Sequence, residues 1–516
     1  MAVWSEGYFT DTEYTDAYFA DISPLMLNLN LTLAGFKTKS QEDITPSANF
    51  NYLELAFGVG SSINIHAVTT DGNYLGTDFN PAQVAFASDC IVSENITLRD
   101  DSFKEFLERL ERENKMFDFI CFHGIFSWIS EENRQIILEI VRKFLKVGGV
   151  VYNSYNCLPG WAPKMPSKEI LAMFYKQNSS MTETNSESVQ KAISFLARFL
   201  DTKPSYMENT PHNKALLDQI KTKDANYLAH EYFNQNWDVF YFHDIAKMME
   251  SAKCDFAVNG DVLEHFDVLN LNEEAQRFIA EQRDPIFKEQ LKDYYISRQF
   301  RKDIYIKGAR KISQNEVKEK LLNTNFVLVG LSKNFKDEMD FNLGSGNLDK
   351  DLYSKVLKFL EKDAFCPKSG LEITEACKIT FFQMIQAMMI LIKQGLVFPA
   401  QKDLSDEVKN RARKYNENMF KKQRKDSASL YLAAPLIASG IRVGNVQQLI
   451  LGEYINGCKS EKEIVKNLLA FFEKTGKSLL KDGAKIDESE SKKNLQETIK
   501  EVFEYLPIYK VLGIVD

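Results

Sequence analysis

Apolar segments and segments with helical spacing alternate between residues 51 and 156, and this pattern restricts the fold more than any other feature of the chain. The apolar segments are NYLELAF, YLGTDF, FDFICFHGIF and VVYNSYN. Such a strand-helix series predicts a mostly parallel, doubly wound α/β sheet, in which ligands bind beyond the carboxyl ends of the strands. We therefore expect four loops to meet in one cleft. These loops follow Glu54, Gly76, Ile120 and Val151.

The composition is that of a long globular chain without basic character. Its 516 residues are 44% hydrophobic and 26% charged, which is enough to bury several cores and suggests about three domains. The chain has 64 basic and 72 acidic residues, so its formal net charge is −8. No overall positive field attracts phosphate backbones, and nucleic acid is therefore not an expected partner.

The sequence lacks the features of secreted and membrane-spanning proteins. The first 21 residues are acidic and have neither the basic start nor the apolar core of a secretory signal. The apolar stretch from Phe381 to Pro399 contains glutamines and a lysine, and it is too short to span a bilayer. The seven cysteines are scattered singly, as is typical of reduced thiols. We expect a cytoplasmic protein without membrane insertion or disulfides.

Two patterns that could suggest zinc do not have the spacing of a zinc site. His230 and Glu231 resemble the start of a zincin helix, but Asn234 stands where the second histidine is needed. Cys366 and Cys377 are too far apart for a structural zinc pair. We predict no metal.

The sharpest local signal is the segment from Glu54 to Gly60, a strand end followed by a turn with two glycines and a helix. Glycine allows positive φ and close approach of a ligand, and the helix offers free N–H groups. A plain strand-helix turn has the same pattern. A dinucleotide fingerprint needs a third glycine where Ile63 stands, which argues against a nicotinamide enzyme.

Acidic residues follow the next two predicted strands. Asp78 stands where a carboxylate can accept both hydroxyls of a ribose. Asp101 and Ser102 lie at the end of a third short extended segment, where an adenine could be contacted. From the residues alone, solvated turns remain the alternative for these positions.

Several long motifs, taken in their order along the chain, resemble those of a known family. The runs YLELAFGVGSSINIHA, YLGTDFNPAQVAFA, FDFICFHGIFSWIS and LKVGGVVYNSYNCLPGW resemble the bacterial class I methyltransferases that carry a methyltransferase regulatory domain. Two later segments, beginning at Asn226 and Tyr294, resemble that regulatory domain. The final third is similar in layout to the C-terminal domain of rickettsial-type protein lysine methyltransferases. One departure is Ala56, where many methyltransferases have glycine.

The resemblance implies a Rossmann-like, seven-stranded methyltransferase domain over residues 1–165, with an N-terminal lid segment. It also implies an α-rich regulatory domain over residues 166–332. A C-terminal, mainly α domain would follow over residues 333–516, where three short helices and the strand GLVFPA have a winged-helix order; a generic helical bundle is the alternative.

The implied cofactor is S-adenosylmethionine, with S-adenosylhomocysteine as product. By the resemblance, Glu54, Gly58 and Gly60 form the cofactor loop. The ribose would be held by Asp78, with Phe79 beside it, and the adenine would lie near Asp101 and Ser102. Tyr14 and His123 complete the predicted contacts, with His123 at the methyl-donor end.

Methyl transfer is an in-line displacement that needs an uncharged, well-oriented nucleophile. A lysine amine must therefore lose its proton first. Candidates for the catalytic wall are His123, Tyr155, Asn156 and Tyr18, because aromatic faces and polar strand ends suit a sulfonium and an incoming amine. Trp128 and Trp161 are further candidates, with core packing as the alternative for every aromatic residue.

The predicted activity is therefore methyl transfer to a protein lysine side chain. A small-molecule methyltransferase and a non-catalytic module that binds S-adenosylmethionine remain alternatives. A protein substrate is the expected partner, and a homodimer is left open.

Overall fold

Seven strands form the central sheet of the computed structural model, which describes residues 16–40, 42–178, 185–208, 212–223, 225–425, 429–481 and 484–516. Their order is β3-β2-β1-β4-β5-β7-β6. Strands β1 to β5 are parallel, and β7 runs antiparallel to both β5 and β6. The bounds are β1 Asn51–Leu55, β2 Asn73–Thr77, β3 Ile96–Arg99, β4 Phe117–Phe122, β5 Leu145–Asn156, β6 Cys254–Asn259 and β7 Phe300–Lys307. The predicted seven-stranded Rossmann-like sheet is confirmed.

Helices cover both faces of this sheet, which explains why central strands such as FDFICF are buried throughout. One face packs against α1 Pro24–Leu33, α2 Ser61–Thr69 and α3 Pro81–Ser88. The other face packs against α4 Phe103–Glu113, α5 Glu131–Phe144 and α11 Phe242–Ser251. The sequence of α4 explains why one side of this helix packs on the sheet, because its buried Phe103, Phe106 and Leu110 recur at helical spacing.

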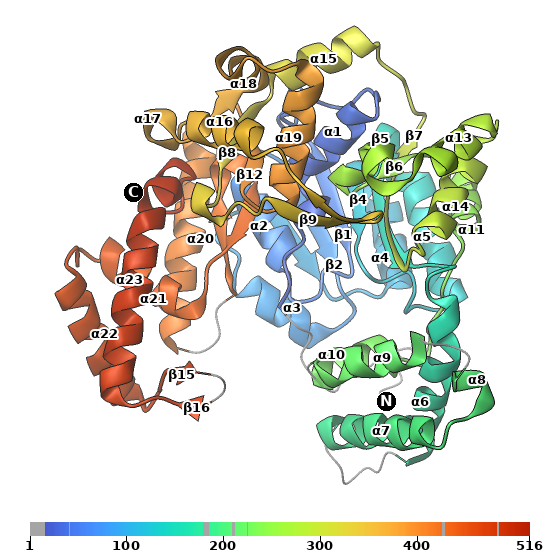
Figure 1. Cartoon of the computed structure of the whole chain (residues 1–516), viewed down its shortest axis with the longest axis horizontal. Coiled ribbons are helices and arrows are strands. Elements are labelled where there is room, and N and C mark those ends of the chain that lie inside the picture. Colours follow the sequence, from blue (N-terminus) through green and yellow to red (C-terminus); the bar gives the residue numbers. More distant parts are fainter. Residues whose placement is uncertain are drawn as a thin grey trace.

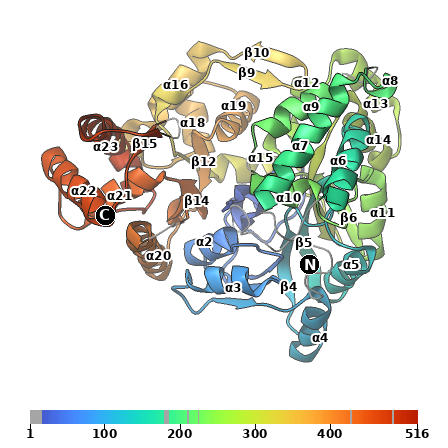
Figure 2. The same cartoon turned by 90° about the horizontal axis from the view of Figure 1, so that it is seen from below.

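The two last strands of the sheet come from the range predicted as an α-rich domain. Strands β6 and β7 lie within residues 166–332, so that range contributes to the central sheet as well as containing helices. The α-rich part of that range contains two groups of helices. A helical insertion between β5 and β6 consists of α6 Met165–Asn178, α7 Asn185–Asp201, α8 Ser205–Glu208, α9 His212–Lys221 and α10 Ala225–Tyr232. Figure 1 shows it as a green unit set off below the sheet, and in the view from below in Figure 2 the same helices lie in front of other elements. The remaining helices are α12 Asp267–Asn270, α13 Glu273–Glu281, α14 Pro285–Tyr295 and α15 Gln314–Asn323.

Residues 333–516, here called the C-terminal unit, begin with a largely exposed hairpin. It is formed by β9 Glu338–Phe341 and β10 Gly344–Asn347. The helix-helix-helix-strand order then follows, and β12 pairs with β8, which precedes the unit in the chain. The elements are β8 Asn325–Leu328, α16 Lys350–Leu360, α17 Lys362–Phe365, β11 Lys368–Ser369, α18 Gly370–Cys377, α19 Phe381–Lys393 and β12 Val397–Ala400.

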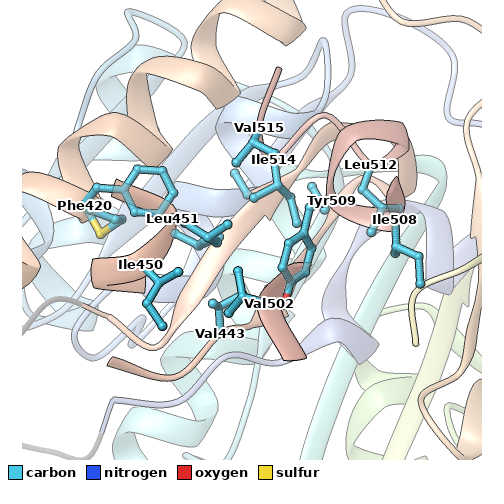
Figure 3. Close-up of a cluster of buried hydrophobic side chains, with 14 of the residues drawn as sticks. Phe420, Val443, Ile450, Leu451, Val502, Ile508, Tyr509, Leu512, Ile514 and Val515 are labelled. Atoms are coloured by element: carbon cyan, nitrogen blue, oxygen red, sulfur yellow. The ribbon is translucent and has the colours of Figure 1, made fainter. Parts of the chain in front are cut away.

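The rest of the C-terminal unit is a helical layer around one apolar cluster (Figure 3). Its elements are α20 Asp406–Lys425, β13 Tyr431–Ala434, β14 Ser439–Arg442, α21 Asn445–Ile455, α22 Glu461–Thr475, β15 Leu480–Lys481, β16 Ala484–Lys485 and α23 Glu488–Val511. Helix α23 begins at Glu488, within a run of charged and polar residues. The Asp487 side chain caps this helix by accepting a hydrogen bond from the backbone N–H of Glu490.

Short 3-10 helices also occur among the described residues. They are Ala20–Ile22, Ala162–Lys164, Val262–His265, Ser332–Asn334 and Pro435–Ile437. In the described ranges no single helix is long and apolar enough to cross a bilayer; only α18 and α19 together reach the required composition, and they are bent by 113°.

Candidate active site

The loop after β1 has the backbone geometry of a ligand-binding turn. Ala56, Gly58 and Gly60 all adopt positive φ, at 54°, 60° and 74°. Gly60 is the N-cap residue of α2, so the free N–H groups of that helix begin at the loop. An alanine in this left-handed region carries strain, which explains physically why glycine suits position 56 better.

Gly60 also lies too close to a neighbouring helix for a side chain. A Cβ at this position would lie 2.5 Å from Ala87 Cβ, whereas a Cβ at Gly148, with a similar φ of 79°, would meet nothing within 4 Å among the described residues. Both alanine variants carry the same backbone strain, but only Gly60→Ala adds a clash. We expect Gly60→Ala to lower the free energy of unfolding by about 1–2 kcal/mol more than Gly148→Ala, as measured by urea denaturation. Equal losses would mean that α3 moves aside freely.

Asp78 follows β2 and faces this loop. Its carboxylate accepts hydrogen bonds from the backbone N–H of Gly58 at 2.9 Å and of Asn80 at 3.0 Å. The side chain is buried, and burial raises the pKa of Asp78 to about 7 in spite of these two bonds. The carboxylate is therefore held in place, in an environment that favours a ligand with hydrogen-bond donors.

Glu54 is the last residue but one of β1 and lines the same cavity as Asp78. Burial raises the pKa of its carboxyl group to about 8. Its Oε2 atom is buried without a hydrogen-bond partner among the described residues. A buried carboxylate oxygen in this state is a strong acceptor for a ligand ammonium or hydroxyl group.

Asp101 and Ser102 directly precede α4, and both also make structural contacts within the protein. Arg109 donates two hydrogen bonds to the Asp101 carboxylate, at 2.5 and 2.8 Å. The Ser102 hydroxyl accepts from the backbone N–H of Glu105 in a capping box. Both residues line the cavity that also contains Glu54 and Asp78, and their place beside an adenine remains a prediction.

His123 follows β4 and is held on two sides. Its Nδ1 atom lies 3.0 Å from the Tyr152 hydroxyl, and its ring stacks on Phe19 with centroids 3.7 Å apart. Burial, with the nearby charge of Lys302, lowers the pKa of His123 to about 3. The imidazole is therefore neutral near pH 7.

These residues meet in one cavity, here called the strand-end pocket. The predicted loops after Glu54, Gly76 and Ile120 line it, whereas none of the described residues of the predicted loop after Val151 does. The pocket is also lined by Ala17, Phe19, Trp128 and Asn236. Gly60 starts the helix next to the pocket but does not line it, and Tyr14 lies outside the described residues. Seven of the predicted cofactor-binding residues line the pocket: Glu54, Gly58, Asp78, Phe79, Asp101, Ser102 and His123.

Three predicted catalytic residues lie elsewhere. The Tyr155 hydroxyl donates to Asp303 at 2.6 Å, and Tyr155 belongs to the core on the opposite face of the sheet from Tyr152. Tyr18 points away from the pocket, although its neighbours Ala17 and Phe19 line it. The reason is the same in both cases, because successive side chains of an extended segment point to opposite sides. Asn156 is buried behind the pocket wall, and its backbone N–H donates to the Ser127 hydroxyl.

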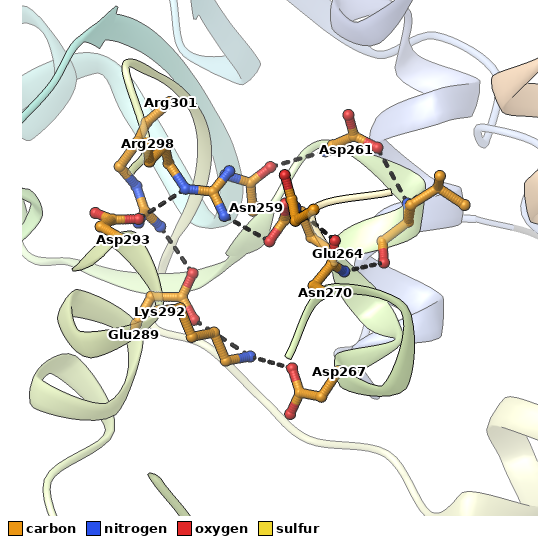
Figure 4. Close-up of polar contacts among 12 residues, drawn as sticks. Asn259, Asp261, Glu264, Asp267, Asn270, Glu289, Lys292, Asp293, Arg298 and Arg301 are labelled. Carbon is orange, nitrogen blue, oxygen red and sulfur yellow. Dashed lines mark hydrogen bonds and ion pairs between the residues drawn. The ribbon is translucent and has the colours of Figure 1, made fainter. Parts of the chain in front are cut away.

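The region behind Tyr155 is a buried ion network (Figure 4). Arg301 is fully buried and bonds Asp303 at 2.9 Å and Asp293 at 2.6 Å. Arg298 bonds Asp293 at 2.7 Å and Glu264 at 2.6 Å. The network joins β7 to α14 and to the 3-10 helix Val262–His265, so it fixes the strand next to β5 rather than the pocket itself. Trp161 also packs outside the pocket, in the core of the helical insertion.

Sequence reasoning missed two kinds of residue. Ala17 and Phe19 reach the pocket from the N-terminal segment, where an alternation of aromatic and small residues was the available signal. Glu231 of α10 was considered only in a rejected zinc pattern. Burial raises the pKa of its carboxyl group to about 7, while the Asn156 amide and the Lys168 ammonium group act to lower it.

Comparisons with known proteins agree with this geometry. A family model described as a methyltransferase domain matches residues 53–153, and one described as a predicted methyltransferase regulatory domain matches residues 224–307. The uncharacterized protein sll1526 of Synechocystis is 33% identical over 99% of this chain and 99% of its own length. The chain belongs to the S-adenosylmethionine-dependent methyltransferases that carry a methyltransferase regulatory domain.

Two rickettsial proteins resemble this methyltransferase over nearly its whole length. The uncharacterized protein RP789 of Rickettsia prowazekii is 22% identical over 96% of this chain and 91% of its own. The structure of PKMT2 from Rickettsia typhi in complex with AdoHcy is 19% identical and covers 97% of this chain and 99% of that chain, with a TM-score of 0.68. At this identity the likeness shows a shared fold across all parts of the chain.

The strand-end pocket of the methyltransferase fits its cofactor chemically. The unpartnered Glu54 Oε2 suits an amino group, and the buried Asp78 carboxylate suits the hydroxyls of a ribose. Individual contacts of these two residues with the cofactor remain proposals.

Proposed function

We propose that this methyltransferase modifies the side-chain amine of lysine in a protein. The observation that carries the proposal is the carboxylate of Glu231, a partly exposed residue that interacts with the Asn156 side chain at the end of β5. Asn156 is bonded to Ser127, whose neighbour Trp128 lines the strand-end pocket. Glu231 is therefore linked through Asn156 and Ser127 to the residues that line the pocket, and we assign it as the partner of the acceptor amine.

The protonation chemistry of this region suits a cationic acceptor. S-adenosylmethionine supplies an electrophilic methyl group, and the acceptor nitrogen must be uncharged when it attacks. Because the pKa of Glu231 is raised to about 7, its carboxylate can attract an ammonium group and also take up a proton near neutral pH. The neutral imidazole of His123 avoids repulsion of that ammonium group.

The architecture beyond the catalytic sheet supports a macromolecular acceptor. Similarity to PKMT2 of Rickettsia typhi extends over 97% of this chain, and therefore includes the helical insertion and the C-terminal unit. This agrees with the resemblance to rickettsial-type protein lysine methyltransferases. A small metabolite alone would not need surfaces of that size.

Labelled cofactor tests the acceptor class. The full chain would be incubated with methyl-tritiated S-adenosylmethionine and either a bacterial protein extract, the same extract with acetylated lysines, or its small-molecule fraction. We expect label in the untreated proteins and little in the acetylated ones. Label that appears only in the small-molecule fraction would contradict the proposal and favour a small-molecule methyltransferase.

Glu231→Gln should impair acceptor use without impairing cofactor binding. Loss of the charged partner should lower kcat/KM for the protein acceptor about 10-fold, which is the effect of one charge-assisted hydrogen bond. The affinity for S-adenosylmethionine should stay unchanged in calorimetry. Glu250→Gln, on the exposed surface of α11, is the matched control. Equal activity of the two variants would remove Glu231 from the proposed site.

A further inference from the structure

The N-terminal segment from Asp16 to Phe19 lies between the strand-end pocket and the C-terminal unit. Ala17 and Phe19 line the pocket, and the Phe19 ring stacks on His123. Asp16 and Tyr18 point to the other side, as the alternation of an extended segment requires. The Asp16 carboxylate accepts hydrogen bonds from the Ser61 hydroxyl at 2.5 Å and from the backbone N–H of Leu430 at 3.2 Å.

The Tyr18 hydroxyl connects α2 with β14 of the C-terminal unit through hydrogen bonds. The hydroxyl oxygen lies 2.6 Å from Ser439 Oγ of β14 and 3.0 Å from His66 Nε2 of α2. Ser439 and His66 are fully buried, and burial lowers the pKa of His66 to about 3, so this chain of groups is neutral. Removal of the tyrosine hydroxyl would leave both neighbours with an unmet hydrogen bond, which is costly in a buried site.

The C-terminal unit also holds the helix that begins at the cofactor loop. Ile65 and Val68 of α2 belong to the same apolar cluster as the helices of the C-terminal unit. Gln401 donates to the backbone oxygen of Thr69 at 3.0 Å, and Arg411 donates to that of Thr70 at 2.7 Å. Helix α2 is therefore fixed along its side and at its end by residues more than 300 positions away in the sequence.

We propose that Ser439 and Tyr18 are positioning residues for cofactor binding: through them, the C-terminal unit holds Ala17 and Phe19 against the strand-end pocket. Neither residue lines the pocket. Both act through Phe19 and its contact with His123. The C-terminal unit is then part of what sets the affinity for S-adenosylmethionine, in addition to any contact that it makes with the acceptor.

The affinity of the full chain for S-adenosylmethionine, measured by calorimetry, tests this role. Ser439→Ala and Tyr18→Phe should each weaken binding about 3- to 10-fold, as expected for one or two buried neutral hydrogen bonds. The double variant should bind no more weakly than Tyr18→Phe, because Ser439 acts through that hydroxyl. The matched control is Ser429→Ala, since the Ser429 hydroxyl accepts a hydrogen bond from Tyr431 N–H at the start of the same hairpin.

A general loss of stability is separated from positioning by thermal unfolding of the same variants. We expect Ser439→Ala and Ser429→Ala to have similar melting temperatures and different cofactor affinities. Wild-type affinity in Ser439→Ala, or an equal loss in Ser429→Ala, would overturn the proposal. If Ser439→Ala does not fold, Ser439→Cys replaces it, because a thiol is a much weaker hydrogen-bond partner for the Tyr18 hydroxyl. Unchanged affinity in Ser439→Cys would overturn the proposal in the same way.

Discussion

Asp78→Ala should weaken the binding of S-adenosylmethionine about 10- to 100-fold, because a charged and buried acceptor contributes about 1.5–3 kcal/mol. The Asp78 carboxylate is 4% exposed and is held by the N–H groups of Gly58 and Asn80. It is therefore oriented before the cofactor arrives, and its loss removes both a ligand contact and a support of the glycine loop. Calorimetric titration of the folded variant measures the effect directly.

Asp100→Ala is the control for this substitution. Asp100 is an exposed carboxylate just after β3, near the same edge of the sheet, and it does not line the strand-end pocket. It should leave the affinity within a factor of about 2, since exposed charges contribute little. Equal affinities of wild type and Asp78→Ala would show that the ribose is held elsewhere, and the proposed contact would have to be abandoned.

The parallel half of the sheet could be predicted because its strands are apolar and regularly spaced. Strands β6 and β7 could not. β7 has the sequence FRKDIYIK, and its Arg301 and Asp303 are both fully buried. Charged residues in a short segment normally indicate exposure. Here they are buried because each finds an opposite charge, with partners on α14 that only the folded chain brings close.

In the candidate site, too, some residues could be predicted from the sequence and others could not. Glu54, Asp78 and His123 could be predicted because each lies at the carboxyl end of a parallel strand or directly after it, so topology alone brings them together. Tyr155 and Tyr18 could not be placed, since one residue of register decides which side an extended segment presents. The stacking of Phe19 on His123 joins positions that are about a hundred residues apart, and no local pattern records such a contact.

Glu54 shows a conflict between stability and cofactor binding that can be measured. Burial raises the pKa of its carboxyl group from 4.5 to about 8 in the ligand-free protein. A group with a raised pKa contributes stability that is fully present below its unfolded pKa and is lost as the pH rises through its folded pKa. The ligand-free protein should therefore lose stability between about pH 4.5 and pH 8 through this one residue, and an ammonium group of the cofactor would restore it.

Glu54→Gln should therefore have two effects of opposite sign. Without an ionisable group at this position, the ligand-free variant should be more stable than wild type by about 2 kcal/mol at about pH 8.5, after the cost of an unmet amide hydrogen bond. Its affinity for S-adenosylmethionine should fall at least about 10-fold, because the charged acceptor is gone. Urea unfolding at about pH 6 and about pH 8.5 measures the first effect, and calorimetry measures the second.

The exposed Glu94→Gln serves as the control, since it removes a carboxylate close in sequence to the same sheet without burying an amide. It should change neither the stability nor the affinity. If Glu54→Gln and wild type lose stability in parallel as the pH rises, the carboxylate is ionised at little cost in the folded protein. A cation of the protein would then have to lie against Glu54. The amino group of the cofactor would in that case add less to binding than the buried, unpartnered Oε2 atom implies.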